Sequence, residues 1–156
     1  MRNEDMTLAY LGNQSLLRLP KTAFLASSTI PVEMVLRCYD WAIEMRKQER
    51  CVISGFSSRL EQDVWKFLVK GQQPIILVLA RSLYHRLPPE LQPLLDSGRL
   101  LIISTSSSTR QSKATAFARN RYICDIADDI LFIGATSSSS LVPLQEEYTQ
   151  KEVILK

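Results

Sequence analysis

Residues 74–104 read PIILVLARSLYHRLPPELQPLLDSGRLLIIS, and this stretch opens and closes with an uninterrupted apolar run. The runs at 74–80 and 100–105 are short and rich in β-branched residues and leucine, as strands are, and the segment 88–98 has the spacing of a short helix that Pro93 interrupts. Strands that are apolar at every position are buried on both faces, which is typical of parallel sheets covered by helices. The stretch therefore predicts one strand, helix and strand unit of an α/β sheet.

The same alternation continues on both sides of this unit. Further strands are expected at 22–27, 51–56, 129–135 and 152–156, and further helices at 31–50, 58–69, 119–127 and 143–148. No internal repeat or long linker divides the chain. We therefore predict a single domain over residues 1–156, in which a leading segment, 1–20, precedes a core at 21–156. The predicted fold class is α/β, with three layers and a Rossmann-like, doubly wound, mainly parallel sheet of about six strands.

Composition limits the function classes. The chain has 156 residues, of which 46% are hydrophobic and 22% are charged, as in one ordinary globular domain. Its net charge of +3 is too small to indicate a nucleic-acid binder, so any basic site must be local. No apolar stretch approaches the roughly 20 residues that span a bilayer, and the first ten residues lack the apolar centre of a secretory signal. We expect a cytoplasmic protein with no membrane partner.

Cysteine and histidine offer little chemistry. Cys38, Cys51 and Cys124 are widely spaced and form no C-x-x-C pair, so we interpret them as small buried hydrophobic residues. His85 is the only histidine, and no nucleophile motif accompanies it. Neither a P-loop nor a glycine-rich dinucleotide turn is present. We therefore expect no catalytic residue, no metal site and no cofactor.

Hydroxyl residues gather in the segments that follow four of the predicted strands. These segments are SST at 27–29, SGFSS at 54–58, STSSST at 104–109 and TSSSS at 136–140. The carboxyl ends of parallel strands meet at one edge of a sheet, which is where open α/β sheets bind ligands. Serine and threonine also cap helices and solvate turns without any ligand, and this alternative remains open.

One segment of the chain is basic and free of acidic residues. Between Asp96 and Asp125 there is no acid, whereas five basic side chains occur there: Arg99, Arg110, Lys113, Arg119 and Arg121. Arg119 and Arg121 are expected at the start of the fourth helix, where the helix dipole already favours an anion. This arrangement predicts phosphate binding, and a solvated basic face is the alternative.

These segments resemble the DNA-processing protein DprA (Smf) family over residues 10–156. YLGNQSLL and PKTAFLASS are similar to its first segments, VISGFSSRLE resembles its second-strand motif Ser-Gly-x-Ala-Arg-Gly-x-Asp, and FARNRYICDIADDILFIGA resembles its Arg-Asn-Arg motif and fifth strand. Several glycines of the family pattern are serines here, among them the glycine of its Ser-Gly-Ser-Leu motif, which corresponds to Ser139. The resemblance implies binding of single-stranded DNA, a homodimer, a RecA-type recombinase as partner and a role in DNA uptake or recombination.

Three functions follow from these observations. The first is binding of single-stranded DNA through its phosphates, and the predicted binding residues are Ser54, Gly55, Arg59, Lys113, Arg119, Asn120, Arg121, Ser137, Ser138, Ser139 and Ser140. The second is a phosphoribohydrolase of the same fold group, which cleaves a nucleoside monophosphate and in which Arg119 and Glu146 or Glu147 would act. The third is an interaction module that has lost ligand binding. We expect no enzymatic activity, with the hydrolase as the minor alternative.

Overall fold

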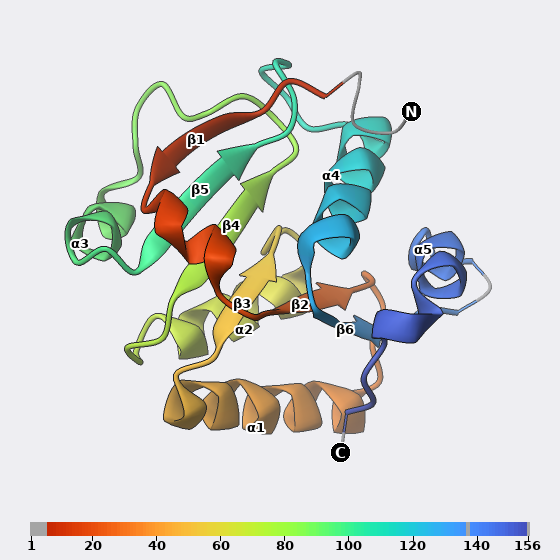
Figure 1. Cartoon of the computed structure of the whole chain (residues 1–156). Helices are drawn as coiled ribbons and strands as arrows, with labels where there is room; N and C mark the ends of the chain where they lie inside the picture. Colours follow the sequence, from red (N-terminus) through yellow and green to blue (C-terminus); the bar gives the residue numbers. More distant parts are fainter. Residues whose placement is uncertain (1–5, 137, 156) are drawn as a thin grey trace.

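A six-stranded sheet forms the centre of the molecule. The computed structural model describes residues 6–136 and 138–155. The strands are β1 (Ala9–Gly12), β2 (Lys21–Ala26), β3 (Cys51–Ser54), β4 (Ile75–Leu79), β5 (Leu100–Ser104) and β6 (Asp129–Ile133). Their order across the sheet is β1-β5-β4-β3-β2-β6, and every neighbouring pair is parallel except β1 with β5 (Figure 1). The predicted fold class, a mainly parallel α/β sheet of about six strands, is confirmed.

Helices cover both faces of this sheet. They are α1 (Val32–Gln48), α2 (Arg59–Leu68), α3 (Gln92–Asp96), α4 (Lys113–Ile126) and α5 (Leu141–Glu147), with short 3₁₀ helices at Gln14–Arg18, Pro89–Leu91 and Thr149–Lys151. One face packs against α1, α2 and α3, and the other packs against α4 and α5. None of the helices in the described ranges is long and apolar enough to cross a membrane.

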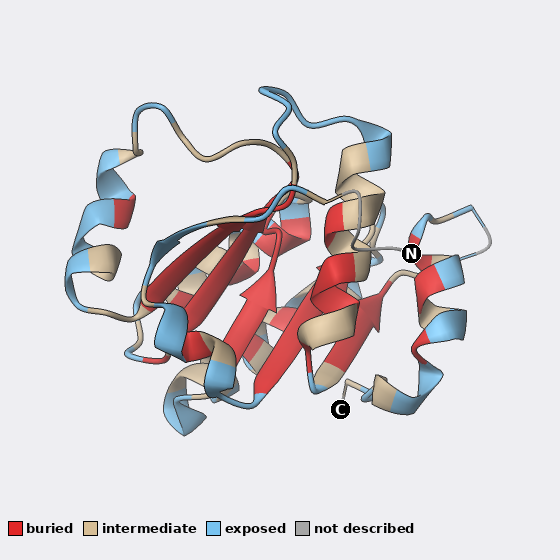
Figure 2. Cartoon of the chain, turned by 45° about the horizontal axis from the view of Figure 1, so that its top comes forward, coloured by how far each residue is buried: buried red, intermediate tan, exposed pale blue. Residues whose placement is uncertain are grey.

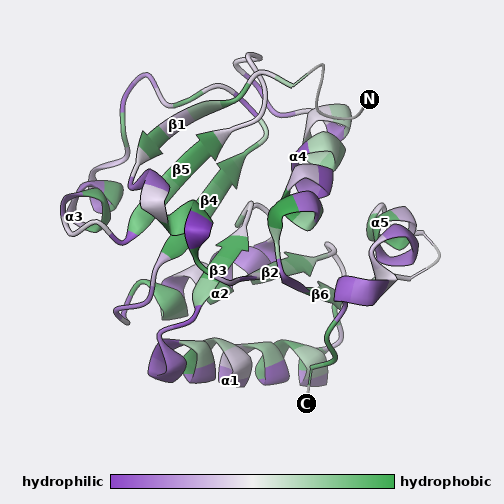
Figure 3. Cartoon of the chain, viewed as in Figure 1, coloured by the Kyte–Doolittle hydropathy of each residue, from purple (hydrophilic) through white to green (hydrophobic). Residues whose placement is uncertain are grey.

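The strands are buried because both of their faces meet a helical layer. Successive residues of β2 show this division, since Ala23 and Leu25 belong to the core under α4 whereas Phe24 packs in the core under α1. Figure 2 shows the buried class concentrated in the strands, and Figure 3 shows that the same strands are the most hydrophobic elements. The continuous apolar runs in the sequence therefore correspond to two cores on opposite faces of one sheet.

The sixth strand differs from the prediction. Residues 152–155 form no strand, and Glu152 makes only an isolated parallel bridge to Ile130; residue 156 lies outside the described part of the chain. The sixth strand is instead β1, from the leading segment, which pairs antiparallel with β5 at the sheet edge. Three of its four residues are exposed, so β1 lacks the continuous apolar pattern that identified the central strands.

Helix α4 begins six residues earlier than predicted. Ser112 caps it: the Ser112 Oγ accepts a hydrogen bond from the Thr115 N–H at 3.1 Å, and the Thr115 Oγ1 accepts one from the Ser112 N–H at 2.8 Å. This reciprocal capping satisfies backbone donors of the first turn. Arg119 and Arg121 consequently lie more than one turn inside α4. The expectation that they stand at a helix start is wrong, and the first-turn cation is Lys113.

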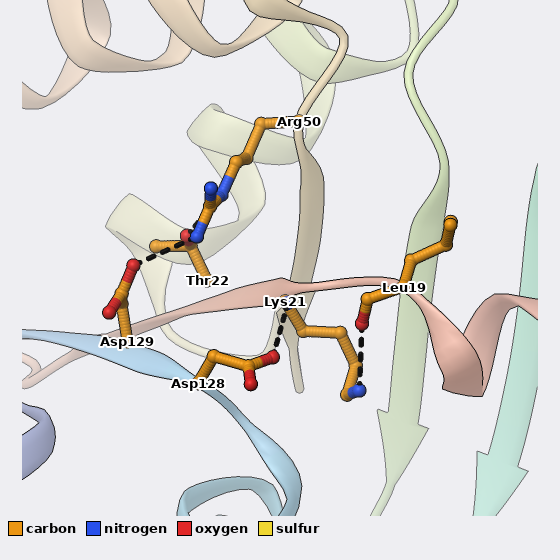
Figure 4. Close-up of polar contacts among 6 residues, drawn as sticks. All are labelled: Leu19, Lys21, Thr22, Arg50, Asp128 and Asp129. Atoms are coloured by element: carbon orange, nitrogen blue, oxygen red, sulfur yellow. Dashed lines mark hydrogen bonds and ion pairs between the residues drawn. The ribbon is translucent and has the colours of Figure 1, made fainter.

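Charged side chains at the amino edge of the sheet are satisfied within the protein. Lys21, which is only 6% exposed, donates through Nζ to the Leu19 carbonyl oxygen at 2.9 Å, and its backbone N–H donates to the Asp128 carboxylate at 2.8 Å (Figure 4). Arg50 forms an ion pair with Asp129 at 2.8 Å. These contacts connect β2 and β3 to the start of β6.

Candidate functional site

The opposite, carboxyl edge contains a topological switch point between β2 and β6. The two strands are parallel neighbours, with Ala26 beside Ile133 at their carboxyl ends. After β2 the chain enters α1 on one face of the sheet, and after β6 it enters α5 on the other face. The two connections diverge at this point and leave a crevice between them. In open α/β sheets, such a crevice is the usual ligand site.

A pocket of about 430 Å³ occupies this crevice, and we call it the switch pocket. It is formed by the loop after β2, one side of α4 and the loop after β6. Its lining residues are Ala26, Ser27, Ser28, Thr29, Lys113, Asn120, Thr136, Ser138, Ser139, Ser140 and Leu141. Seven of these carry hydroxyl groups, one is a cation, and none of the described lining residues is acidic. The pocket therefore offers hydrogen-bond donors and one positive charge, which suits an anion.

Lys113 and Asn120 reach the pocket from α4. They are seven residues apart, which places them on one side of the helix, two turns from each other. Lys113 is exposed, and no described residue gives its ammonium group a hydrogen bond or an ion pair. Asn120 is half-buried, and its Oδ1 accepts a hydrogen bond from Arg119 at 2.7 Å. This bond orients the amide so that its NH₂ group is the part available to a ligand.

Arg119 lies beneath the carboxyl edge and does not reach the surface. Its side chain is 3% exposed, and its Nη1 donates to the Val78 carbonyl oxygen at 3.2 Å. Burial lowers the pKa of this guanidinium below its usual value, and the negative charge of Glu61 partly offsets the effect. Direct contact with phosphate would require the group to leave both Val78 and Asn120. In the folded arrangement Arg119 instead positions Asn120.

The turn after β3 fits closely over this arginine. A Cβ atom on Gly55 would lie 2.5 Å from the Arg119 Cζ, closer than non-bonded atoms approach, so any larger residue here would require the guanidinium to move. Ser54 is fully buried, and its Oγ accepts a hydrogen bond from the Phe56 N–H at 3.0 Å. The Ser54-Gly55 pair therefore supports the site from below and does not itself line the switch pocket.

Glu61 fastens the start of α2 to the end of β2. One of its carboxylate oxygens accepts the backbone N–H groups of Ser57 at 2.8 Å and Ser58 at 3.2 Å, and the other accepts the Ala26 N–H at 3.0 Å. The carboxylate is 4% exposed and thus fully used by backbone donors. Sequence reasoning missed this residue, although a serine three positions before a glutamate is the pattern of a capping box.

The remaining predicted site residues have different surroundings. Arg59 is exposed in the first turn of α2 and does not line the switch pocket. Arg121 forms an ion pair with Glu147 of α5 at 3.0 Å, and its guanidinium lies over the Phe117 ring at 5.3 Å. It thus connects α4 to α5. Ser137 lies outside the described residues.

Two of the four hydroxyl-rich loops meet in the switch pocket, namely 27–29 and 136–140. The third, after β5, is joined to the turn after β3, because Gln111 donates through Nε2 to the Ser57 Oγ at 3.2 Å. Residues 27–29 and Thr136 are not among the predicted binding residues, although their loops belong to the predicted group of hydroxyl-rich segments. The sequence feature that could have identified these residues is their position directly after β2 and β6.

Residue types that often take part in catalysis have the following surroundings. No three histidine, cysteine, aspartate or glutamate side chains among the described residues are placed to hold a metal ion. Cys38, Cys51 and Cys124 are buried free thiols, as predicted. Glu147 forms an ion pair with Arg121, and Arg119 donates to the Val78 carbonyl oxygen.

Several solved structures share this fold. DNA processing protein A from Streptococcus pneumoniae superimposes with a TM-score of 0.71 at 20% identity, over 92% of this chain and 52% of that one. DNA processing protein A from Helicobacter pylori, described with a single-stranded DNA binding mode, gives 0.70 at 21% identity, over 92% and 68%. A molybdenum cofactor binding protein from Rippkaea orientalis gives 0.56 at 14% identity, over 88% and 79%.

The chain spans about half of the pneumococcal protein, so it corresponds to one part of that molecule. No curated protein matches the sequence. The family model of DNA recombination-mediator protein A, however, matches residues 1–154, which include every strand, every helix and the whole of the switch pocket. The chain belongs to the DNA recombination-mediator protein A family.

Proposed function

We propose that this protein binds single-stranded DNA and holds a backbone phosphate in the switch pocket. The observation that supports this most strongly is the composition of that pocket, with seven hydroxyl groups, Lys113 and Asn120 at the switch point, and no acid among its described lining residues. Phosphate oxygens accept hydrogen bonds from such groups and are attracted by the ammonium charge. The Helicobacter pylori neighbour, which has a single-stranded DNA binding mode, supports the same ligand.

The position of Lys113 strengthens the attraction. It is the first residue of α4, where backbone N–H groups and the helix dipole both favour negative charge, and no acidic residue occurs in that first turn. Serine hydroxyls from the loops after β2 and β6 face the same pocket. Binding would thus depend on Lys113 and hydroxyl groups, without a direct contact from Arg119.

Fluorescence anisotropy with a labelled oligonucleotide tests this proposal. Replacing Lys113 by glutamine removes one cation from the pocket, and we expect weaker binding at low salt. The slope of log affinity against log salt should become shallower by about 0.7, the contribution of one phosphate contact on a single strand. Lys47→Gln is the matched control, because Lys47 is an exposed lysine in the last turn of α1, at the amino edge.

The salt slope of the unaltered protein provides a second measurement. Four contacts, through Arg59, Lys113, Arg119 and Arg121, would give a slope of about −2.8. With Arg119 buried and Arg121 paired to Glu147, two accessible cations remain from that set, and we expect roughly −1.4. Absence of binding at low salt, or equal binding by the Lys113→Gln and Lys47→Gln variants, would contradict the proposal and favour an interaction module without ligand.

The phosphoribohydrolase alternative has less support. It requires an arginine and a glutamate that act together, whereas Arg119 is directed to Val78 and Glu147 is paired with Arg121. We expect no release of adenine when the protein is incubated with AMP and the mixture is separated by chromatography. Adenine release that disappears in a Glu147→Ala variant would establish the hydrolase.

The partners and setting implied by the family remain part of the proposal. They are a homodimer, a RecA-type recombinase that receives the DNA, a role in DNA uptake or recombination, and a cytoplasmic location. Light scattering of the purified protein tests the dimer, since a mass near twice 17.8 kDa is expected. A mass near 17.8 kDa at micromolar concentration would exclude it under those conditions.

A further inference from the structure

A second cavity lies beside α2, on the other face of the sheet from α4. It has a volume of about 270 Å³, and we call it the α2 groove. Three aromatic side chains line it: Phe56 from the turn after β3, Trp65 from α2 and Tyr84 from the loop after β4. Lys66 and Glu90 lie among its polar lining residues. Aromatic walls with a few polar groups are typical of sites that bind a planar ring.

Backbone strain supports a role for Phe56 in this groove. Its φ angle is 47°, in the left-handed region that a bulky side chain rarely adopts. This conformation is held by the bond from its N–H to the Ser54 Oγ, and it places the ring 5.0 Å from that of Trp65 in an edge-on arrangement. Such strain persists where the surroundings enforce it and is concentrated at binding sites.

Charge distinguishes the α2 groove from the switch pocket. The switch pocket has Lys113 and no acid among its described lining residues, whereas the α2 groove has one cation, Lys66, and one anion, Glu90. A phosphate gains little electrostatic attraction where a positive and a negative charge are balanced. A neutral ring with polar edges, in contrast, can contact both Lys66 and Glu90. Burial raises the pKa of Tyr84, so its hydroxyl stays protonated and can donate a hydrogen bond.

Size also limits the occupant. Sites for drug-sized ligands measure about 300–1,000 Å³, so a groove slightly below that range suits a single ring system and not a whole nucleotide. A chain of contacts links the groove to the switch pocket. Gly55, which lines the groove, lies directly over the Arg119 guanidinium, and Arg119 bonds Asn120, which lines the switch pocket. One buried side chain therefore connects the two sites.

We propose that the α2 groove binds a nucleobase, stacked among Phe56, Trp65 and Tyr84, while the switch pocket holds a phosphate of the same strand. This inference rests on the proposed function for its DNA ligand. The base of a free nucleoside would make the same contacts as a base of the DNA strand. The experiment therefore distinguishes these two ligands.

Trp65 provides a direct reporter of the groove. The chain has two tryptophans, and Trp41→Phe leaves Trp65 as the only one, while a ring is kept in contact with Phe24. In this background we titrate an oligothymidylate and an abasic oligonucleotide of equal length, which keeps the phosphates but lacks bases. We expect the oligothymidylate to quench Trp65 and to bind roughly 5-fold to 150-fold more tightly than the abasic strand, as expected for one stacked base.

Tyr84→Ala tests the groove itself. Tyr84 lies in a loop and is only partly buried against the core under α1 and α2, so its removal leaves the fully buried core residues in place. We expect the ratio of affinities for the two strands to fall several-fold. Affinity for the abasic strand should stay unchanged. Tyr39→Ala is the matched control, because Tyr39 is another half-buried tyrosine that contacts Asp63 of α2 outside the groove. It should leave the ratio as it is.

The outcomes separate the two proposals. If both strands bind equally well, or Tyr84→Ala leaves the ratio unchanged, the nucleobase site is overturned while phosphate binding stands. If neither strand binds, the proposed function fails. Titration with adenosine, followed by Trp65 fluorescence, then tests whether the groove binds a free nucleoside. Saturable quenching that Tyr84→Ala removes would support a site for a free nucleoside, and the absence of quenching would overturn the inference.

Discussion

At the scale of single residues, Gly55 determines how closely the turn after β3 approaches Arg119. Serines occupy the loops at 27–28 and 138–140 because those positions line an open pocket, where a side chain has room. Gly55 has no such room, since an added Cβ would lie 2.5 Å from the Arg119 Cζ. We expect Gly55→Ala to lower the free energy of unfolding by about 1–3 kcal/mol, as overpacking of a closely packed site does, measured by urea denaturation.

An Arg119→Met background provides the control for this prediction. Methionine is flexible and makes no bond to Val78, so it can move away from the added methyl group. The cost of Gly55→Ala should therefore be smaller in that background, with a coupling of about 0.5–3 kcal/mol between the two changes. Equal costs in both backgrounds would show that the glycine is required for another reason.

At the scale of elements, the sequence predicted those strands and helices that carry a continuous or periodic apolar pattern. The strands β3, β4 and β5 and the helices α1 and α2 lie within two residues of their expected bounds, because burial on both sides of the sheet requires such patterns. The exposed edge strand β1 lacks that pattern, and the start of α4 depends on hydrogen bonds between Ser112 and Thr115. Threonine is a weaker signal for such a cap than glutamate or glutamine.

The cap of α4 yields a prediction for that element. Ser112→Ala removes the oxygen that accepts the Thr115 N–H, so we expect the free energy of unfolding to fall by about 1 kcal/mol in urea denaturation. Ser107→Ala is the matched control, because Ser107 is exposed in the preceding loop and its side chain makes no hydrogen bond with a described residue. A loss as large in the control would show that the effect does not come from the cap.

At the scale of the whole molecule, the site depends on contacts between distant parts of the chain. Ser27 donates to the Gly134 carbonyl oxygen across 107 positions, and Arg119 donates to Val78 across 41. Sequence patterns indicated the carboxyl edge, Lys113, Asn120 and the serines at 138–140. They did not indicate that Arg119 is buried, because its burial follows from the position of α4 over the β3 turn.

The molecule as a whole should lose stability at alkaline pH. Cys38, Cys51 and Cys124 are at most 3% exposed, and burial raises the pKa of each thiol to about 12, compared with about 8.5 in an unfolded chain. Between these values the folded protein keeps protons that the unfolded chain releases, so the stabilisation is complete below about pH 8.5 and decreases as the pH rises towards 12. We expect a loss of roughly 1 kcal/mol per cysteine between pH 8 and pH 9.5, measured by urea denaturation.

Removal of one thiol isolates its share of this effect. Cys124→Ala should reduce the loss of stability between the two pH values by about a third, because the other two thiols still titrate, even though the variant is less stable at both. The folded protein should also react slowly with a thiol reagent at pH 8, since the thiolate is the nucleophile and burial keeps all three groups protonated. Rapid labelling of the folded protein, or an equal pH dependence in the variant, would show that the buried thiols do not cause the alkaline destabilisation.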